Sequence, residues 1–143
     1  MNTTAESSNS NSRVLIVDDN SEFTHRISEL LQDTHHYVVC EENDARRALE
    51  TARSFHPDLI LLDLIMPQAD GTEVAAQITS DWMLHSVPIV FVTALITREK
   101  AARRSSHRRT SRCPEAGSRS RSNQIGRGEF ALLLGRVSGL AKY

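Results

Sequence analysis

The feature that most constrains this chain is a set of short, continuous apolar runs that stop abruptly at polar residues. Residues 14–17 (VLIV) lead directly into Asp18, and residues 59–62 (LILL) lead directly into Asp63. A third run of the same kind covers residues 89–92 (IVFV). Such runs are typical of strands that are buried on both faces of a parallel sheet. The sequence therefore predicts an α/β fold with acidic residues at the ends of two strands.

Between these runs the apolar residues follow a helical period instead. Residues 36–40 are a further strand candidate, and Asn20 and Asp44 are suited to cap the helices that follow the first two strands. The predicted apolar helix faces consist of Phe23, Ile27, Leu30 and Leu31, then Ala45, Ala48, Leu49 and Ala52, then Val74, Ala75 and Ile78. Strands alternating with helices at this spacing imply βαβ units with right-handed crossovers, and hence a doubly wound parallel sheet.

The polar residues at the strand ends are the candidate functional site. In an open parallel sheet, ligands bind outside the carboxyl ends of the strands, where Asp18, Asp19, Asp63 and Thr93 are expected to meet. Converging carboxylates repel one another, which makes a hard divalent cation such as Mg²⁺ their natural partner. A carboxylate can also attack a phosphoryl group and form an acyl phosphate.

Four segments in order carry a family resemblance: VLIVDDN at 14–20, LLDLIMP at 61–67, DGTE at 70–73 and VTA at 92–94. Together they resemble the receiver domains of two-component response regulators, over about residues 13–100. The resemblance implies a doubly wound, flavodoxin-like receiver fold. It also implies a signalling domain that accepts a phosphoryl group and is not an enzyme acting on other molecules. We expect a cytoplasmic protein, because the sequence shows neither a membrane-spanning run nor a signal peptide.

The resemblance assigns a role to each candidate residue. Asp63 would accept the phosphoryl group from a phosphohistidine on a sensor histidine kinase or a phosphotransfer protein. Asp18 and Asp19 would bind Mg²⁺ together with Asp63 and the backbone carbonyl of Ile65. Thr93 would contact the phosphoryl group. The kinase, the stimulus and the downstream target are not indicated by any motif.

The resemblance fails after Lys100. Receiver domains have a fifth strand that ends in a lysine, followed by a fifth helix, but Lys100 follows Thr93 too closely for this role and Lys142 lies too far along the chain. We therefore expect the last strand and helix to be absent or aberrant. A long insertion before a strand that ends at Lys142, loss of the native end, and translation in a shifted reading frame all fit the pattern.

Charge divides the chain at the same place. Residues 1–100 contain 7 basic and 16 acidic side chains, whereas residues 101–143 contain 10 basic and 2 acidic ones. We expect a disordered segment at 1–12, a receiver domain at 13–100 and an atypical Arg/Ser-rich segment at 101–143. An alternative function is an inactive receiver-like module that binds nucleic acid or an acidic partner through this segment. We favour a solvated tail, because residues 101–128 contain no Phe, Trp or Tyr to stack on bases.

Several other classes of protein are disfavoured. No apolar run is long enough to cross a bilayer, and the first 12 residues do not resemble a signal peptide. The sequence contains no phosphate-binding glycine motif of the nucleotide-binding proteins. Cys40 and Cys113 belong to no metal-ligand pattern, and we expect both to be reduced thiols without a structural role.

Overall fold

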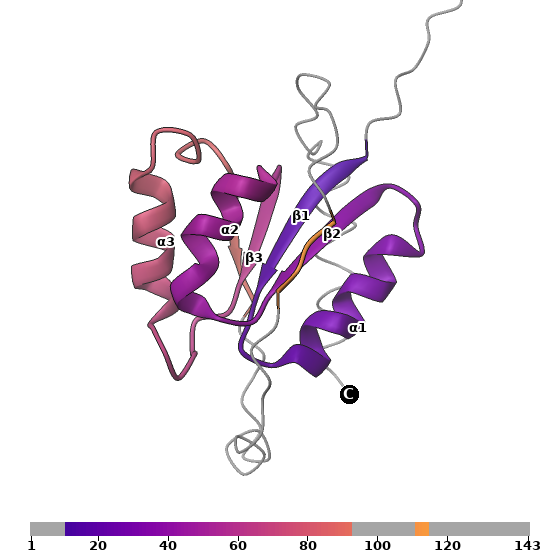
Figure 1. Ribbon diagram of the computed structural model, residues 1–143, viewed down its shortest axis with the longest axis horizontal. Helices are drawn as coiled ribbons and strands as arrows, with labels where there is room; N and C mark the ends of the chain where they lie inside the picture. The colour runs from indigo at the N-terminus through magenta and orange to yellow at the C-terminus, as the bar shows by residue number, and fades with distance from the viewer. Residues whose placement is uncertain (1–10, 93–110, 115–143) are drawn as a thin grey trace, which may run out of the picture.

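A computed structural model of the chain describes residues 11–92 and 111–114. These residues form strands and helices in alternation (Figure 1). In chain order they are β1 (Ser12–Val17), α1 (Ser21–Gln32), β2 (Tyr37–Glu42), the 3₁₀ turn η1 (Ala45–Arg47), α2 (Ala48–Phe55), β3 (Leu59–Leu62), α3 (Gly71–Ser80), β4 (Ile89–Phe91) and β5 (Ser111–Arg112).

The strands form one sheet in the order β4-β3-β1-β2-β5. The pairs β1–β2, β1–β3 and β3–β4 are parallel, whereas β5 lies antiparallel to β2. Helices cover both faces: α2 and α3 lie on one side of the sheet and α1 on the other (Figure 1). This arrangement confirms the predicted doubly wound α/β fold.

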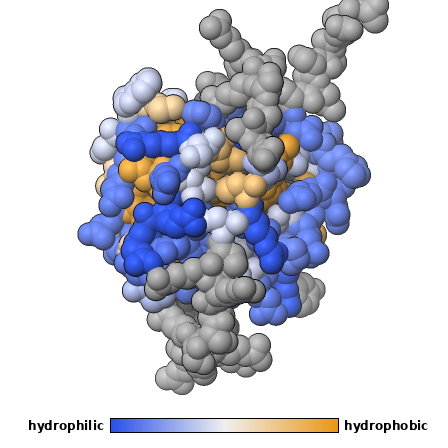
Figure 2. Space-filling view, viewed as in Figure 1, coloured by the Kyte–Doolittle hydropathy of each residue, from blue (hydrophilic) through white to orange (hydrophobic). Residues whose placement is uncertain are grey.

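Side chains alternate along the inner strands and so build a separate apolar core on each face. Leu15, Val17, Ile60 and Leu62 belong to the core under α2 and α3. Their neighbours in sequence belong to the core under α1, where they pack with Ile27 and Leu31, and this second set consists of Val14, Ile16, Leu59 and Leu61. Hydrophilic residues cover most of the surface seen in Figure 2, while hydrophobic ones show around its middle and beside α2 and α3.

Local sequence determines where the helices start and stop. The Asn20 side chain accepts hydrogen bonds from the backbone N–H groups of Glu22 and Phe23, and so caps α1 as predicted. The Asp44 carboxylate caps in the same way, but the turn that it begins is 3₁₀ before it becomes the α-helix α2. Helix α2 ends at Phe55, and the next residue, His56, has left-handed backbone angles and caps the helix.

The second strand is longer than predicted and begins one residue later. It runs from Tyr37 to Glu42, and therefore includes two glutamates that periodicity alone places outside a buried strand. Glu41 is 6% exposed and Glu42 is fully buried. Both carboxylates are accommodated because they accept hydrogen bonds: Glu41 from the hydroxyl of Thr24, and Glu42 from the hydroxyl of Thr51 at 2.6 Å.

The cysteine prediction is wrong. Cys40 in β2 forms a disulfide with Cys113, which directly follows β5. The two residues are 73 positions apart, and the antiparallel pairing of residues 111–112 with β2 brings them together. No local spacing in the sequence signals this pairing.

Among the described residues, β5 does not take the place of a receiver's fifth strand, and the expectation that the last strand and helix are absent or aberrant concerns residues outside the described ranges. A receiver's fifth strand is expected beside β4, whereas Ser111–Arg112 lies at the opposite edge of the sheet. The Ser111 hydroxyl additionally donates a hydrogen bond to the buried carboxylate of Glu42.

Several sequence-based expectations fall outside the residues that the structure describes. They concern Thr93, Lys142, most of the segment 1–12, and residues 101–143 apart from 111–114. Within the described ranges, no helix combines the length and the apolar character needed to span a membrane.

Candidate functional site

The acidic cluster lies where β1 and β3 end. These neighbouring parallel strands are in register, with Val17 opposite Leu62, so the next residues, Asp18 and Asp63, emerge at the same edge of the sheet. The backbone N–H of Asp63 donates to the carbonyl of Val17 at 2.9 Å, and this bond extends the pairing by one residue. The fold therefore brings together carboxylates that are 45 positions apart, as the sequence predicted.

Asp18, Asp19 and Asp63 each offer a carboxylate oxygen to this cluster, and the three oxygens lie within 4.8 Å of one another. Asp18 is 1% exposed and Asp63 is 6% exposed, while Asp19 is half-buried. Three negative charges at this separation and in poor contact with water repel one another strongly. A divalent cation with oxygen ligands fits this donor set, since it offsets the repulsion and matches carboxylate chemistry.

Hydrogen bonds to the side chain and to the main chain orient Asp18. Its carboxylate oxygen Oδ1 accepts from the backbone N–H of Asn20 at 2.8 Å, in a turn that leads into the capping of α1. Its backbone carbonyl accepts from Nδ2 of Asn43 at 2.7 Å. The side chain and the main chain of this residue are thus held by two different segments.

The loop after β3 follows directly from Asp63 and leads into α3. Ile65 and Asp70 form an antiparallel bridge, and the N–H of Gly71 donates to the carbonyl of Leu64 at 3.0 Å. Asp70 caps α3 by accepting from the N–H and the hydroxyl of Thr72, and these bonds hold the pKa of the Asp70 carboxyl below its usual value. The bridge and the Gly71–Leu64 hydrogen bond therefore join the start of the loop that carries Ile65 to its end.

Gly71 is required for the close approach of α3 to this loop. A Cβ atom at this position would lie 2.2 Å from the carbonyl oxygen of Asp63 and 2.7 Å from Cα of Leu64. No side chain fits there, and Gly71 thereby places the start of α3 directly against the backbone of Asp63. Gly71 therefore limits the distance between α3 and the end of β3.

The position of β4 brings a third strand end to the same edge. The N–H of Val92 donates to the carbonyl of Leu62, the residue before Asp63, at 2.9 Å. Thr93, the next residue, lies outside the described part of the chain, and so its predicted place in the site stays a prediction.

Sequence reasoning missed one residue at the site, Asn43. It follows β2, it is 3% exposed, and it contacts the backbone of Asp18. The polar run Glu41–Asp44 after an apolar strand was the available signal, but it does not indicate which of the four side chains turns toward β1.

Comparison with known proteins gives a consistent result. The family model described as the response regulator receiver domain matches residues 14–107. The transcriptional regulatory protein PdtaR of Mycobacterium tuberculosis is 34% identical over 91 residues, which cover 64% of this chain and 43% of PdtaR. The chain thus aligns with less than half the length of this relative.

Solved structures agree with the fold. The chemotaxis response regulator CheY4 of Vibrio cholerae superposes with a TM-score of 0.56 at 30% identity, covering 65% of this chain and 77% of that one. The phosphorylated cyanobacterial phytochrome response regulator RcpA gives a TM-score of 0.52 at 33% identity, covering 65% and 72% of the two chains. The resemblance noted in the sequence is confirmed by these matches.

Proposed function

Because the chain belongs to the response regulator receiver family, we propose that it is a phosphoacceptor in His-to-Asp signalling, with Asp63 as the residue that is phosphorylated. The observation that carries this proposal is the meeting of Asp18, Asp19 and Asp63 at one edge of the parallel sheet. Asp63 is the nucleophile in this proposal because it matches the phosphoacceptor aspartate of the receiver domains that the sequence resembles, and its backbone is held between β1 and the start of α3. A fixed backbone limits the directions in which the carboxylate can point.

The proposed reaction transfers a phosphoryl group from the imidazole nitrogen of a phosphohistidine to a carboxylate oxygen of Asp63. The phosphorus–nitrogen bond breaks as the phosphorus–oxygen bond forms, so Asp63 becomes an acyl phosphate and the donor histidine is regenerated. The donor is a sensor histidine kinase or a phosphotransfer protein, and the chain itself is a signalling domain and not an enzyme. The description of RcpA as phosphorylated supports this assignment by analogy.

In this proposal Asp18, Asp19 and Asp63 hold Mg²⁺ together with the backbone carbonyl of Ile65. When bound, Mg²⁺ neutralises charge on the transferred phosphoryl oxygens. The Ile65 side chain is 50% exposed, which is compatible with a residue that serves through its backbone. Thr93 would donate its hydroxyl to a phosphoryl oxygen.

Labelling with a small phosphodonor tests the assignment of Asp63. With Mg²⁺ and acetyl phosphate, the protein should gain one phosphoryl group that is stable to acid and labile to hydroxylamine, and Asp63→Asn should gain none. Asp58→Asn is the matched control: Asp58 precedes the same strand at its opposite end and accepts from the N–H of Arg13 at 2.8 Å. Labelling of Asp63→Asn at the wild-type level would refute the proposal.

Metal dependence tests the rest of the site. Chelation of Mg²⁺ should abolish labelling, and Asp19→Ala should weaken Mg²⁺ binding because it removes one oxygen ligand and one negative charge. Titration followed by NMR chemical shifts measures the affinity directly. Equal Mg²⁺ affinity in the wild type and in Asp19→Ala would place the cation elsewhere.

A further inference from the structure

Asn43 lies at the point where the pairing of β1 with β2 ends. The last residue pair of this ladder joins Val17 to Glu42, and the N–H of Asp18 then donates to the carbonyl of Glu42 at 3.2 Å. Beyond this point the ladder ends, and the carbonyl of Asp18 accepts its hydrogen bond from a side chain instead of from the backbone of β2. Nδ2 of Asn43 donates to the carbonyl of Asp18 at 2.7 Å.

These two bonds hold both peptide groups that flank Asp18. The Asp18 N–H belongs to the peptide before it, and the Asp18 carbonyl belongs to the peptide that joins it to Asp19. Because the Asp18–Asp19 peptide sets the starting direction of both side chains, its orientation determines where two of the three carboxylates point. Asn43 is therefore placed to control the shape of the acidic cluster without contributing a ligand to it.

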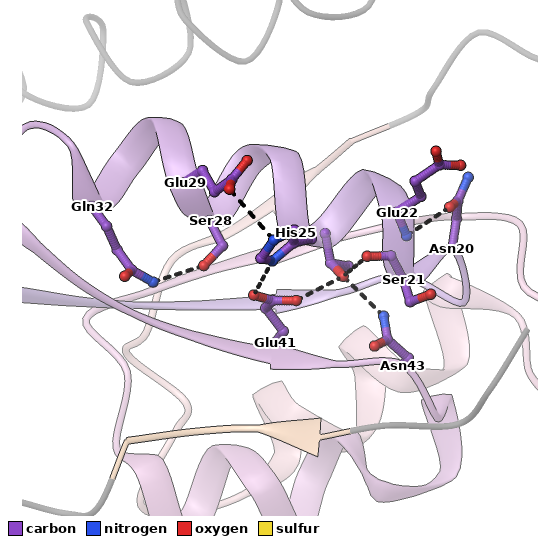
Figure 3. A network of polar contacts seen from close by, with 10 residues as sticks. Asn20, Ser21, Glu22, His25, Ser28, Glu29, Gln32, Glu41 and Asn43 are labelled. Carbon is purple, nitrogen blue, oxygen red and sulfur yellow. Dashed lines mark hydrogen bonds and ion pairs between the residues drawn. The ribbon is translucent and has the colours of Figure 1, made fainter.

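A second hydrogen bond fixes Asn43 itself. The same Nδ2 atom lies 3.1 Å from Oγ1 of Thr24 on α1, and so donates one hydrogen to the carbonyl of Asp18 and the other to the hydroxyl of Thr24. The Thr24 hydroxyl in turn lies 3.2 Å from the Glu41 carboxylate. This carboxylate also contacts His25 (Figure 3). Thr24 is fully buried, and Asn43 and Glu41 are 3% and 6% exposed.

We propose that Asn43, held by Thr24, is a positioning residue that pre-arranges Asp18 and Asp19 for a divalent cation. This inference deepens the proposed function and depends on it for the identity of the cation. It concerns residues outside the ligand set, joined to it by hydrogen bonds at 2.7 and 3.1 Å.

The physical reason lies in the repulsion between the carboxylates. Without a cation, like charges within 4.8 Å of one another favour separation, and a peptide that can rotate allows them to separate. Mg²⁺ requires near-octahedral geometry and tolerates displaced ligands poorly. A hydrogen bond that holds the peptide in the binding orientation therefore lowers the free-energy cost of rearranging the carboxylates when the cation binds. Residues that orient metal ligands typically change metal affinity by about 10- to 100-fold when they are removed.

The test is the affinity of Mg²⁺ alone, measured on the full chain by NMR chemical shifts of the Asp18 and Asp19 amides. Asn43→Ala should raise the dissociation constant by about 10-fold. Thr24→Val, which keeps the shape of the side chain but loses the hydroxyl, should raise it by a smaller factor. Thr24→Ser restores the hydroxyl and should bring the affinity back to the wild-type value.

Thr51→Ala is the matched control for a general loss of stability. Thr51 is 7% exposed and donates a 2.6 Å hydrogen bond to Glu42, so its removal also deletes one buried hydrogen bond from β2. It lies on α2, across the sheet from Thr24, and makes no bond to Asp18. Urea unfolding of each variant should show comparable destabilisation, while the Mg²⁺ affinity of Thr51→Ala stays at the wild-type value.

The outcomes separate this inference from the proposed function. Wild-type affinity in Asn43→Ala, or an equal loss of affinity in Thr51→Ala, would overturn the role of Asn43 while leaving Asp63 as the phosphoacceptor. Mg²⁺ binding that depends on Asn43 without any labelling of Asp63 would overturn the proposed function alone. A wild-type chain that binds no Mg²⁺ would overturn both.

Discussion

Replacing Gly71 with alanine should damage the site through the backbone, without touching any side chain in it. The new Cβ would lie 2.2 Å from the carbonyl oxygen of Asp63, whereas ordinary contact between such atoms begins near 3.4 Å. Helix α3 and the end of β3 must therefore separate by about 1 Å. The N–H of Gly71, now 3.0 Å from the carbonyl of Leu64, would move beyond hydrogen-bonding distance.

The cost can be worked out from these contacts. Forcing an extra carbon into a packed position costs about 1 to 3 kcal/mol, and the lost hydrogen bond adds about 1 kcal/mol. The better helix propensity of alanine returns at most about 1 kcal/mol. We therefore expect Gly71→Ala to lower the free energy of unfolding by about 2 kcal/mol, and a 1 Å displacement of Asp63 to slow phosphorylation by about 100-fold.

Urea unfolding and the rate of labelling by acetyl phosphate measure the two effects separately. Glu73→Ala is the control, because this exposed residue lies in the same first turn of α3. Labelling is measured at a urea-free condition in which both variants are folded. If Gly71→Ala is labelled as fast as Glu73→Ala, then contact between α3 and the Asp63 backbone does not position the acceptor.

Three further outcomes are expected. Cys113→Ser, or reduction of the wild type by a dithiol, should lower the free energy of unfolding by about 4 kcal/mol, because the disulfide joins residues 73 positions apart. Equal stability of the reduced and oxidised chains would exclude this disulfide. Leu61→Ala should cost about 2 to 5 kcal/mol in urea unfolding, because this fully buried side chain lies in the core under α1, and a loss below that range would contradict its packing. The Arg53 guanidinium donates to Asp81 at 2.8 Å and holds the pKa of that carboxyl below its usual value. The bond therefore stabilises the fold above about pH 4 and is lost as pH falls through the lowered pKa, so Arg53→Ala should be less stable than wild type at pH 7, with a difference that shrinks on acidification.

The inner strands and their acidic ends could be predicted because the relevant signals are local. A strand that is buried on both faces must be apolar throughout, so residues 59–62 identify β3 without knowledge of its neighbours. Parallel pairing then fixes which ends meet, and Asp18 and Asp63 follow from the fold class alone. The structure adds the distance, since it places carboxylate oxygens of these two residues and Asp19 within 4.8 Å of one another.

What could not be predicted depends on contacts between distant segments. The burial of Glu42 depends on hydroxyl groups from α2 and from Ser111, neither of which is near it in the sequence. The pairing of Cys40 with Cys113 follows from the two-residue strand β5, which has no apolar pattern of its own. The roles of Gly71 and Asn43 likewise depend on distant neighbours: the Asp63 carbonyl lies against Gly71, and Asn43 donates to Asp18 and Thr24.

The composition of β2 has a consequence for the order in which the chain folds. Strands β1, β3 and β4 can gain free energy from apolar burial as soon as they meet, but the end of β2 carries two carboxylates that lose their hydration when buried. Their hydrogen-bond donors come from α1, α2 and β5, which must dock before this burial becomes favourable. We therefore expect the transition state for folding to contain the β1–β3–β4 ladder while the end of β2 is still hydrated. In φ-value terms, Ile60→Val should slow folding, whereas Thr51→Ala should mainly accelerate unfolding.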